Sequence, residues 1–521
     1  MEFRISPLLG KGTLSAISGK LSQPGAGWSR KLGRDRIWAF AALGAFLLQA
    51  YLVIIHEPWV DEWQAFQIAL LSPDFASLLE NLRYEGHPPL WYLILRFVGL
   101  FVHPLSVLMT VQLAIALSIQ ALVLLRLPLP RIQRVCIALG YFLLIEYGTV
   151  ARSYSLGVLF LISFFVIENR KFRWSMVALL PMVDFQFGLL SIVAIALLWR
   201  EGDRSPVGMM CWFASALLAA WTVIPAPDMV QAQQPLKGII GVLPTMSLLS
   251  SQLVPLHIFP GTIDWGLPWP GALGVVMGIL FVWMADTILR YDRFHRLLFH
   301  GFLWACFFFS TIIYPFGVRH FSLVPLLLIL LVATRKQADD VPHPAFKIWI
   351  SIVALAGLFG AVVSFIMPFD VSDKAAAVMK QRGLEKEIWV AWPDFTGGGL
   401  VSRLQIEMGS VKKGCTQAFN RWDNDHRYRS VRAMGENFSD FADKYGSFYV
   451  SSAMNLDAVG KYVPMRQIAF IPPGYNHYEF HLYQVAYDRN PTGMRPPSCA
   501  PNRLPVSAWT NPAFRQNWLR F

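Results

Sequence analysis

The residues best suited to chemistry lie in one polar stretch, residues 56–103, between two apolar segments. Asp61 and Glu62 follow the first long apolar run within a few residues, which places them close to a membrane surface. A carboxylate in that place is suited to take a proton from an acceptor hydroxyl group or to hold a divalent cation. The alternative is structural, because Asp and Glu also favour the first turn of a solvated helix. Charge alone leaves both interpretations open.

A second cluster of polar residues lies in the later part of the same stretch. Glu85 and His87 come just before two prolines and an apolar segment. Proline suits the first turn of a helix, and the amino end of a helix attracts anions. Trp91 and Tyr92, just beyond, are typical of the membrane–water interface. The pattern predicts a helix start that faces an anion, with an ordinary loop histidine as the alternative interpretation of His87.

The composition excludes a single soluble domain. Of the 521 residues, 55% are hydrophobic and only 15% are charged, whereas soluble domains average about 25% charged residues. A surface that faces lipid explains this imbalance, because a soluble core of this size needs a polar exterior. The net charge of +12 belongs to basic residues that cluster between apolar runs. That distribution indicates membrane topology, so we expect a lipid bilayer and no nucleic acid as partner.

The apolar runs predict a polytopic α-helical membrane protein with about 11 transmembrane helices, within a range of about 10 to 13. The first run, Ile37 to Ile55, is long enough to span and lacks a small-residue cleavage site, so we expect it to be retained. The run 88–102 is short and carries Arg96, which predicts an interfacial helix on the outer leaflet. Runs 174–183 and 187–199 are short for two spans, and the count is open there. Other spans are expected near 104–125, 135–150, 153–167, 207–224, 270–289, 297–314, 318–334 and 346–367.

The basic residues orient these spans. The N-terminal tail, residues 1–36, and five short loops hold 21 Lys and Arg residues, whereas all other loops of the membrane domain 37–367 hold five. The positive-inside rule then places the tail in the cytoplasm and the long loops 56–103 and 225–269 outside. We expect a multi-pass protein of the plasma (inner) membrane with an extracytoplasmic, or periplasmic, C-terminus.

Residues 368–521 predict a small extracytoplasmic α/β domain. Strands are expected at 387–392, 446–452, 466–472 and 479–487, with helices at 373–381 and 437–445 between them. Cys415 and Cys499 both lie in this polar part and are a candidate disulfide if it is exported.

The motifs together resemble a known family. An apolar span, Asp61-Glu62, and a His-Pro-Pro-Leu helix start at His87 are similar to the GT-C glycosyltransferases. The resemblance is closest to the protein-mannosyltransferase-like branch that uses polyprenyl-phosphate sugars and includes the lipid A aminoarabinose transferase. It continues to about residue 367 through Ala-Arg-Ser-Tyr-Ser-Leu at 151–156 and Arg319 before an apolar run. It implies a GT-C-type fold with interfacial helices in the first outer loop.

The resemblance also implies residue roles. Asp61 matches the catalytic aspartate, the general base, and Glu62 matches its acidic neighbour. Glu85 and His87 match the pair that faces the lipid phosphate, and Arg319 matches an arginine near that phosphate. The second acidic residue of the family has two candidates here, Glu146 and Asp184. A divalent metal ion, with Asp61 as a ligand, stays open as a cofactor.

Three further basic residues are candidates for substrate binding. Lys237 and His257 lie in the long outer loop 225–269, where they could contact phosphate, belong to a lid, or be ordinary loop residues. Arg152 could contact the lipid phosphate or sugar, or pair internally with Glu146, because ionisable groups at membrane depth usually pair.

The expected function is that of an inverting glycosyltransferase. It would move a sugar from a polyprenyl-phosphate donor to an envelope acceptor (glycolipid, polysaccharide or protein) on the outer face of the membrane. One alternative is a transporter or flippase of polyprenyl-linked glycans, and another is a glycan ligase or polymerase that uses diphosphate-linked carriers. Transporters usually place charged groups near mid-bilayer, whereas here they gather at the outer interface, which favours the enzyme.

Overall fold

The computed structural model describes residues 25–229, 241–256, 271–334, 342–423, 430–476, 478–486, 494–499, 504 and 506. The chain divides into two compact units, Met1–Gly44 and Ala45–Phe521. It is mostly helical, with one small sheet near its C-terminal end. Within the described ranges, four helices are long and apolar enough to cross a membrane, as expected for a membrane protein: Arg36–Ile55, Pro104–Arg126, Gly271–Leu289 and Pro344–Ile366.

By this measure the described residues fall short of the predicted count of about 11 spans. Several other apolar segments form helices of only 10–17 residues, because turns and polar caps divide the runs. One example separates α8 (Arg170–Leu179) from α9 (Phe185–Arg200). There a 3₁₀ turn contains Pro181, and the Asp184 carboxylate accepts a hydrogen bond from the Gln186 amide at 3.1 Å. Such a cap satisfies an amide that the helix itself leaves unpaired.

The first polar stretch folds into three short helices, α2 (Val60–Leu71), α3 (Phe75–Leu82) and α4 (Leu90–Gly99). The run 88–102 therefore forms a helix of ten residues, which is short for a span, as the sequence predicted. Arg96 on α4 is buried, and its guanidinium donates to the backbone oxygen of Ala69 at 2.7 Å and also to that of Ser72. Arg96 thus satisfies carbonyl groups at the end of α2 and joins the two helices.

The third expected span is interrupted before it reaches residue 150. It forms α6 (Arg131–Ala138), then a π-helical turn (Phe142–Glu146), and is not helical at 147–152. Such a break frees carbonyl groups, which need partners in an apolar environment. Buried glutamines of α1 and α5 (Val107–Ala121) supply them: Gln49 donates to Leu144 O, Gln112 to Tyr147 O and Gln120 to Ala138 O. The segment that leads to Arg152 is therefore held in a defined conformation.

The C-terminal part contains a mixed six-stranded sheet in the order β3-β2-β1-β4-β6-β5. β1 lies parallel to β2 and β4, and the other pairs are antiparallel. The four predicted strands and both predicted helices are present, whereas the three-residue strands β2 and β3 are too short for a sequence pattern to reveal. The bounds are β1 Trp389–Trp392, β2 Met408–Ser410, β3 Cys415–Gln417, β4 Phe448–Ser452, β5 Met465–Ile471 and β6 Phe480–Val485, with α18 Ser372–Gln381, α19 Gly398–Leu404 and α20 Val431–Tyr445.

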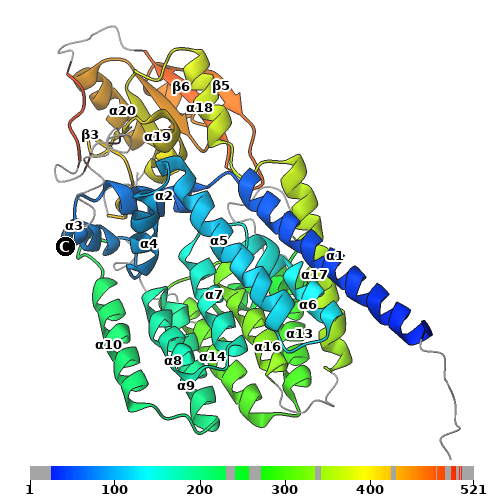
Figure 1. The fold of residues 1–521 in the computed structure, drawn as a ribbon. Coiled ribbons are helices and arrows are strands. Elements are labelled where there is room, and N and C mark those ends of the chain that lie inside the picture. Colours follow the sequence, from blue (N-terminus) through cyan, green and yellow to red (C-terminus); the bar gives the residue numbers. More distant parts are fainter. Residues whose placement is uncertain are drawn as a thin grey trace, which may run out of the picture. The chain divides into compact units, whose positions relative to one another are not determined.

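The sheet and the short helices of the first polar stretch belong to the same compact unit. Figure 1 shows the strands at one end of this unit, with α2, α3 and α4 between them and the apolar helices that follow. α19 packs directly on α2. The sheet side has its own core, where Phe438 and Phe441 of α20 pack against Phe448 of β4. The fold thus brings α2, with Asp61 in its first turn, between two structured layers.

The remaining elements of the Ala45–Phe521 unit complete the helical part. α7 (Ser153–Val166) packs against α5 and α8, and α10 (Pro206–Thr222) packs against α8. Further along the chain lie α11 (Val242–Leu248), α12 (Ser250–Leu253), α13 (Gly271–Leu289), α14 (Arg293–Ile312), α15 (Val318–Phe321), α16 (Leu323–Ala333) and α17 (Pro344–Ile366).

Candidate active site

Asp61 lies between two arginines that come from distant parts of the chain. Its Oδ2 atom is 2.6 Å from a guanidinium nitrogen of Arg152 and 3.0 Å from one of Arg319. The Asp61 side chain is 24% exposed, so the residue is only partly covered by the protein. Burial opposes ionisation, but the two guanidinium groups outweigh this effect and hold the pKa of Asp61 below its usual value. Asp61 is therefore an anion at neutral pH, as a proton acceptor has to be.

Arg319 is held in place through its backbone and its side chain. It lies in the short helix α15, and its carbonyl oxygen accepts a hydrogen bond from the Tyr147 hydroxyl at 2.8 Å. Its guanidinium stacks over the Trp59 ring at 5.2 Å. Stacking of this kind orients the planar guanidinium, whose N–H groups bind anions in the plane of the group.

Glu62 has very different surroundings from its neighbour Asp61. Its side chain is fully buried, and its two oxygens face three donors. His56 Nε2 lies 2.8 and 3.1 Å from them, the Trp59 amide 3.1 Å and the Ala151 amide 2.6 Å. The predicted catalytic role of Glu62 is not supported by this geometry, because all of these partners belong to the protein and the side chain has no open side. Glu62 instead ties α2 to the residue that precedes Arg152.

His87 and Asp184 form a second polar pair beside the first. His87 Nδ1 is 2.9 Å from the Asp184 carboxylate, and its Nε2 is 3.4 Å from a guanidinium nitrogen of Arg152. A neutral His87 that carries its proton on Nδ1 satisfies both contacts, since Nε2 then accepts from Arg152. Of the two candidates for a second acid, the structure places Asp184 beside the Asp61 group. The Glu146 carboxylate accepts a hydrogen bond from the Tyr141 hydroxyl at 3.2 Å.

Arg152 pairs with Asp61 and contacts His87, whereas one prediction had paired it with Glu146. The reason is the chain path. The interrupted third span ends before residue 147, so the chain crosses to α2, where Glu62 binds the Ala151 amide.

Glu85 joins the group through the first outer stretch. It is partly buried, and Gln64 Nε2 donates to its Oε1 at 2.8 Å. Burial raises the pKa of the Glu85 carboxyl, although the Gln64 hydrogen bond counteracts part of this effect. Gln64 also exchanges two hydrogen bonds with the Asn420 backbone, at 2.6 and 3.0 Å. Gln64 thus links Glu85, a candidate substrate-binding residue, to the C-terminal part of the chain from residue 368 onwards. This part contains the sheet and is called the sheet domain.

The sheet domain holds α2 at several points. Gln67 donates to the Gly398 carbonyl at 2.7 Å and to the Ser402 hydroxyl at 2.9 Å, and Arg403 forms an ion pair with Glu57. An apolar cluster reinforces these contacts with side chains from the first stretch, the 150 region and the sheet domain: Trp59, Val60, Val150, Phe369 and Tyr475. The helix that carries Asp61 is therefore positioned from both sides.

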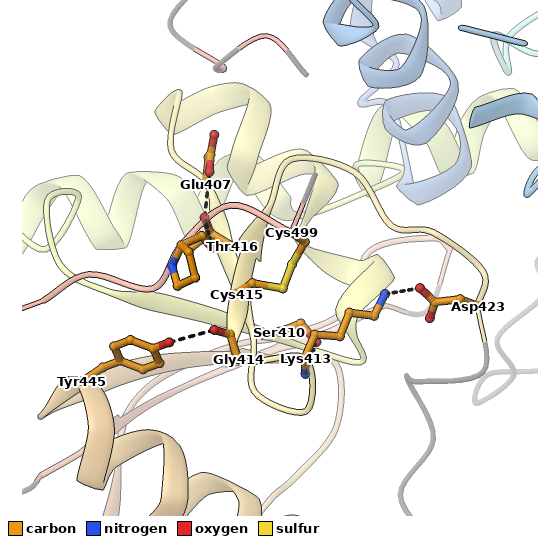
Figure 2. Close-up of a disulfide and its surroundings, with 10 residues drawn as sticks. Glu407, Ser410, Lys413, Gly414, Cys415, Thr416, Asp423, Tyr445 and Cys499 are labelled. Atoms are coloured by element: carbon orange, nitrogen blue, oxygen red, sulfur yellow. Dashed lines mark hydrogen bonds and ion pairs between the residues drawn. A yellow bond between two sulfur atoms is a disulfide. The ribbon is translucent and has the colours of Figure 1, made fainter. Parts of the chain in front are cut away.

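Cys415 and Cys499 form a disulfide bond, which Figure 2 shows with its surroundings. Backbone hydrogen bonds accompany it, from Thr416 to Pro497 at 2.7 Å and from Cys499 to Thr416 at 2.8 Å. The bond anchors β3, which precedes Asn420 by only a few residues. The pair suggested by the sequence is thus close in space, and it stabilises the segment that contacts Gln64.

Two of the sequence candidates, Lys237 and His257, lie outside the described residues. Among the residues that are described, no group of three or more His, Cys, Asp and Glu side chains could hold a metal ion. The surroundings of Asp61 do not fit a divalent cation either, because two guanidinium groups already neutralise its carboxylate. We therefore assign no step to a metal.

Sequence reasoning missed the residues that support the site. His56 contacts Glu62, the Trp59 ring stacks against Arg319, and Gln64 donates a hydrogen bond to Glu85. All three supporting residues lie within a few residues of the Asp61-Glu62 pair. The only signal was their clustering around that pair, since buried amides and aromatic side chains are common in any membrane protein.

Comparison of the chain with models of protein families, with curated proteins and with solved structures gave no match. The assignment of a function therefore depends on the residues and geometry described above.

Proposed function

We propose that the protein is an inverting glycosyltransferase that moves a sugar from a polyprenyl-phosphate donor to an envelope acceptor on the outer face of the membrane. The observation that supports this most directly is the partly exposed Asp61 carboxylate beside Arg152 and Arg319. A base and two phosphate-binding cations are the groups that such a transfer needs. The residues also follow the pattern of the GT-C glycosyltransferases, which the sequence resembles.

In the proposed reaction, Asp61 accepts the proton of the acceptor hydroxyl group as its oxygen attacks the anomeric carbon. The leaving group is the lipid phosphate on the opposite side of the sugar, so the configuration at that carbon inverts. Arg152 and Arg319 stabilise the negative charge that develops on the phosphate, which preorganised guanidinium groups do well outside bulk water. His87, held by Asp184, lies beside Arg152 and helps to orient its guanidinium group.

The proposal includes a topology of eleven spans. Four are the long apolar helices, and the others are formed by the shorter or more polar elements α6 with its π-helical turn, α7, α8, α9, α10, α14, and α15 with α16. The distribution of basic residues supports a cytoplasmic N-terminus and an outer location for α2–α4. A disulfide in the sheet domain supports its location outside the cytoplasm, where thiols are oxidised.

The test is the replacement Asp61→Asn in the full chain, with Asp74→Asn as the matched control. Asp74 caps α3, and Asn is an equally good cap. Mass spectrometry of envelope lipids and glycans should show the loss of one sugar increment in Asp61→Asn cells, with a fall in transfer of about 10²–10⁴-fold. Undiminished transfer by a folded, inserted variant would refute the proposal.

Two measurements separate the proposed function from its alternatives, the first of which is the chemical form of the released lipid. A lipid monophosphate supports the proposed donor, whereas a lipid diphosphate indicates a ligase or polymerase. Movement of a polyprenyl-linked glycan across vesicles without a new glycosidic bond indicates a transporter.

A further inference from the structure

The two arginines of the site face two competing demands. They bind Asp61 directly, at 2.6 and 3.0 Å through the same oxygen, Oδ2. The proposed function, on which this inference rests, also assigns them the donor phosphate. Both partners are oxyanions that bind the N–H donors along the edge of a guanidinium group, so they compete for the same donors.

We infer that Arg152 and Arg319 pass from the Asp61 carboxylate to the lipid phosphate during the reaction, and that protonation of Asp61 and departure of the phosphate are electrostatically coupled. The neighbouring contacts favour this exchange. Arg319 stacks on Trp59 and Arg152 contacts His87 Nε2, so each guanidinium has a second support when its contact with Asp61 is lost.

The charges of the step balance. Before transfer, Asp61 carries one negative charge and the donor phosphodiester carries another. The acceptor oxygen forms its bond to the anomeric carbon, the bond from that carbon to the phosphate oxygen breaks, and the hydroxyl proton moves to Asp61. Afterwards Asp61 is neutral and the lipid phosphate monoester carries about two negative charges. The two arginines therefore face the same total charge throughout, while the negative charge moves from the base to the leaving group.

This coupling predicts that a neutral residue at position 61 favours the lipid monophosphate. The probe is farnesyl monophosphate, with farnesol as the uncharged control, and the measurement is binding to the purified full chain in nanodiscs of neutral lipid. Asp61→Asn should bind farnesyl monophosphate about tenfold more tightly than the wild type, because couplings between linked sites are commonly of this size. Farnesol binding should not change, and Asp74→Asn should match the wild type.

The arginine variants complete the test. Arg152→Gln and Arg319→Gln should each weaken binding of the monophosphate. In the double variant Asp61→Asn with Arg319→Gln, the gain from Asp61→Asn should shrink, because the competing contact is already gone. Asp61→Ser serves as a second neutral variant in case Asp61→Asn does not fold. Unchanged or weaker binding of the monophosphate by a folded neutral variant would overturn the coupling.

The two proposals fail separately. If the neutral variants bind the monophosphate more tightly but the wild type transfers no sugar, the glycosyltransferase function is wrong and the competition stands. If the wild type transfers sugar and the neutral variants show no gain, the function stands and the coupling is wrong.

Discussion

Replacing Glu62 by Gln tests whether the two adjacent carboxylates have different roles. One oxygen of Glu62 faces the Ala151 amide and the other faces the Trp59 amide, and His56 Nε2 lies near both. Glutamine keeps the size of the side chain but turns one oxygen into an NH₂ group. In either orientation that group faces a backbone N–H, so two donors oppose each other in a buried place.

The magnitude follows from these contacts. A hydrogen bond to a charged acceptor contributes about 1.5–3 kcal/mol, and a buried N–H without a partner costs about 1–3 kcal/mol. We therefore expect Glu62→Gln to lower the free energy of unfolding by about 3 kcal/mol. Asp61→Asn should change it by less than about 1 kcal/mol, because the Asp61 side chain is 24% exposed and asparagine keeps an oxygen that accepts hydrogen bonds from the arginines.

The assay is equilibrium unfolding of the purified chain in mixed dodecyl sulfate micelles, paired with the sugar-transfer measurement. Glu80→Gln is the matched control, since the Glu80 side chain is 65% exposed, and should change stability by no more than about 0.5 kcal/mol. We expect Glu62→Gln to lose both stability and transfer, and Asp61→Asn to lose transfer alone. A Glu62→Gln variant of normal stability that has lost sugar transfer would refute this reasoning and would support a catalytic role for Glu62.

Three more predictions concern the sheet domain and the phosphate site. Burial raises the pKa of Asp394 to about 6, so the folded protein binds this proton more tightly than the unfolded chain, and stability falls as pH rises from about 4 to 6. Asp394→Asn should remove this fall and raise the unfolding free energy at pH 7.5 by up to about 3 kcal/mol, as measured by unfolding at about pH 4 and at pH 7.5. Replacing Cys415 and Cys499 by Ser opens a crosslink between residues 84 apart and should lower stability by up to about 4 kcal/mol; a reductant should then destabilise the wild type and leave the variant unchanged. Arg319→Lys keeps the charge but loses the planar fork, so sugar transfer should fall at least about tenfold in the same mass-spectrometric assay while the unfolding free energy stays within about 1 kcal/mol.

Local patterns predicted the parts of the fold that depend on local chemistry. The strand 446–452 and the helix 437–445 show the alternation and spacing of their type, and both are present. The interruption after Ala138 had no such signal, because its carbonyls find partners in glutamines of other helices. β2 and β3 were missed because three residues are too few to show alternation.

The candidate site was predicted in part. Asp61, His87 and Arg319 were proposed from their motifs, and the structure places Asp61 and Arg319 in contact. The roles of Glu62 and Arg152 were not separable from the sequence. Both are charged residues near a membrane surface, and only their partners distinguish a buried structural carboxylate from a cation at the site.

By itself, the amino-acid sequence determined that this chain has apolar helices, a polar first stretch with an acidic pair, and an α/β part with two cysteines. These features follow from the composition and from the periodicity of the sequence, which can be recognised within short segments of the chain. Only the tertiary structure decided which charges meet. Asp61 and Arg319 are far apart along the chain. Their contact depends on the Glu62–Ala151 hydrogen bond, on the stacking of Arg319 over Trp59, and on the hydrogen bonds between the sheet domain and α2. Long-range contacts of this kind leave no local pattern, because each partner satisfies its own requirements with groups from another element.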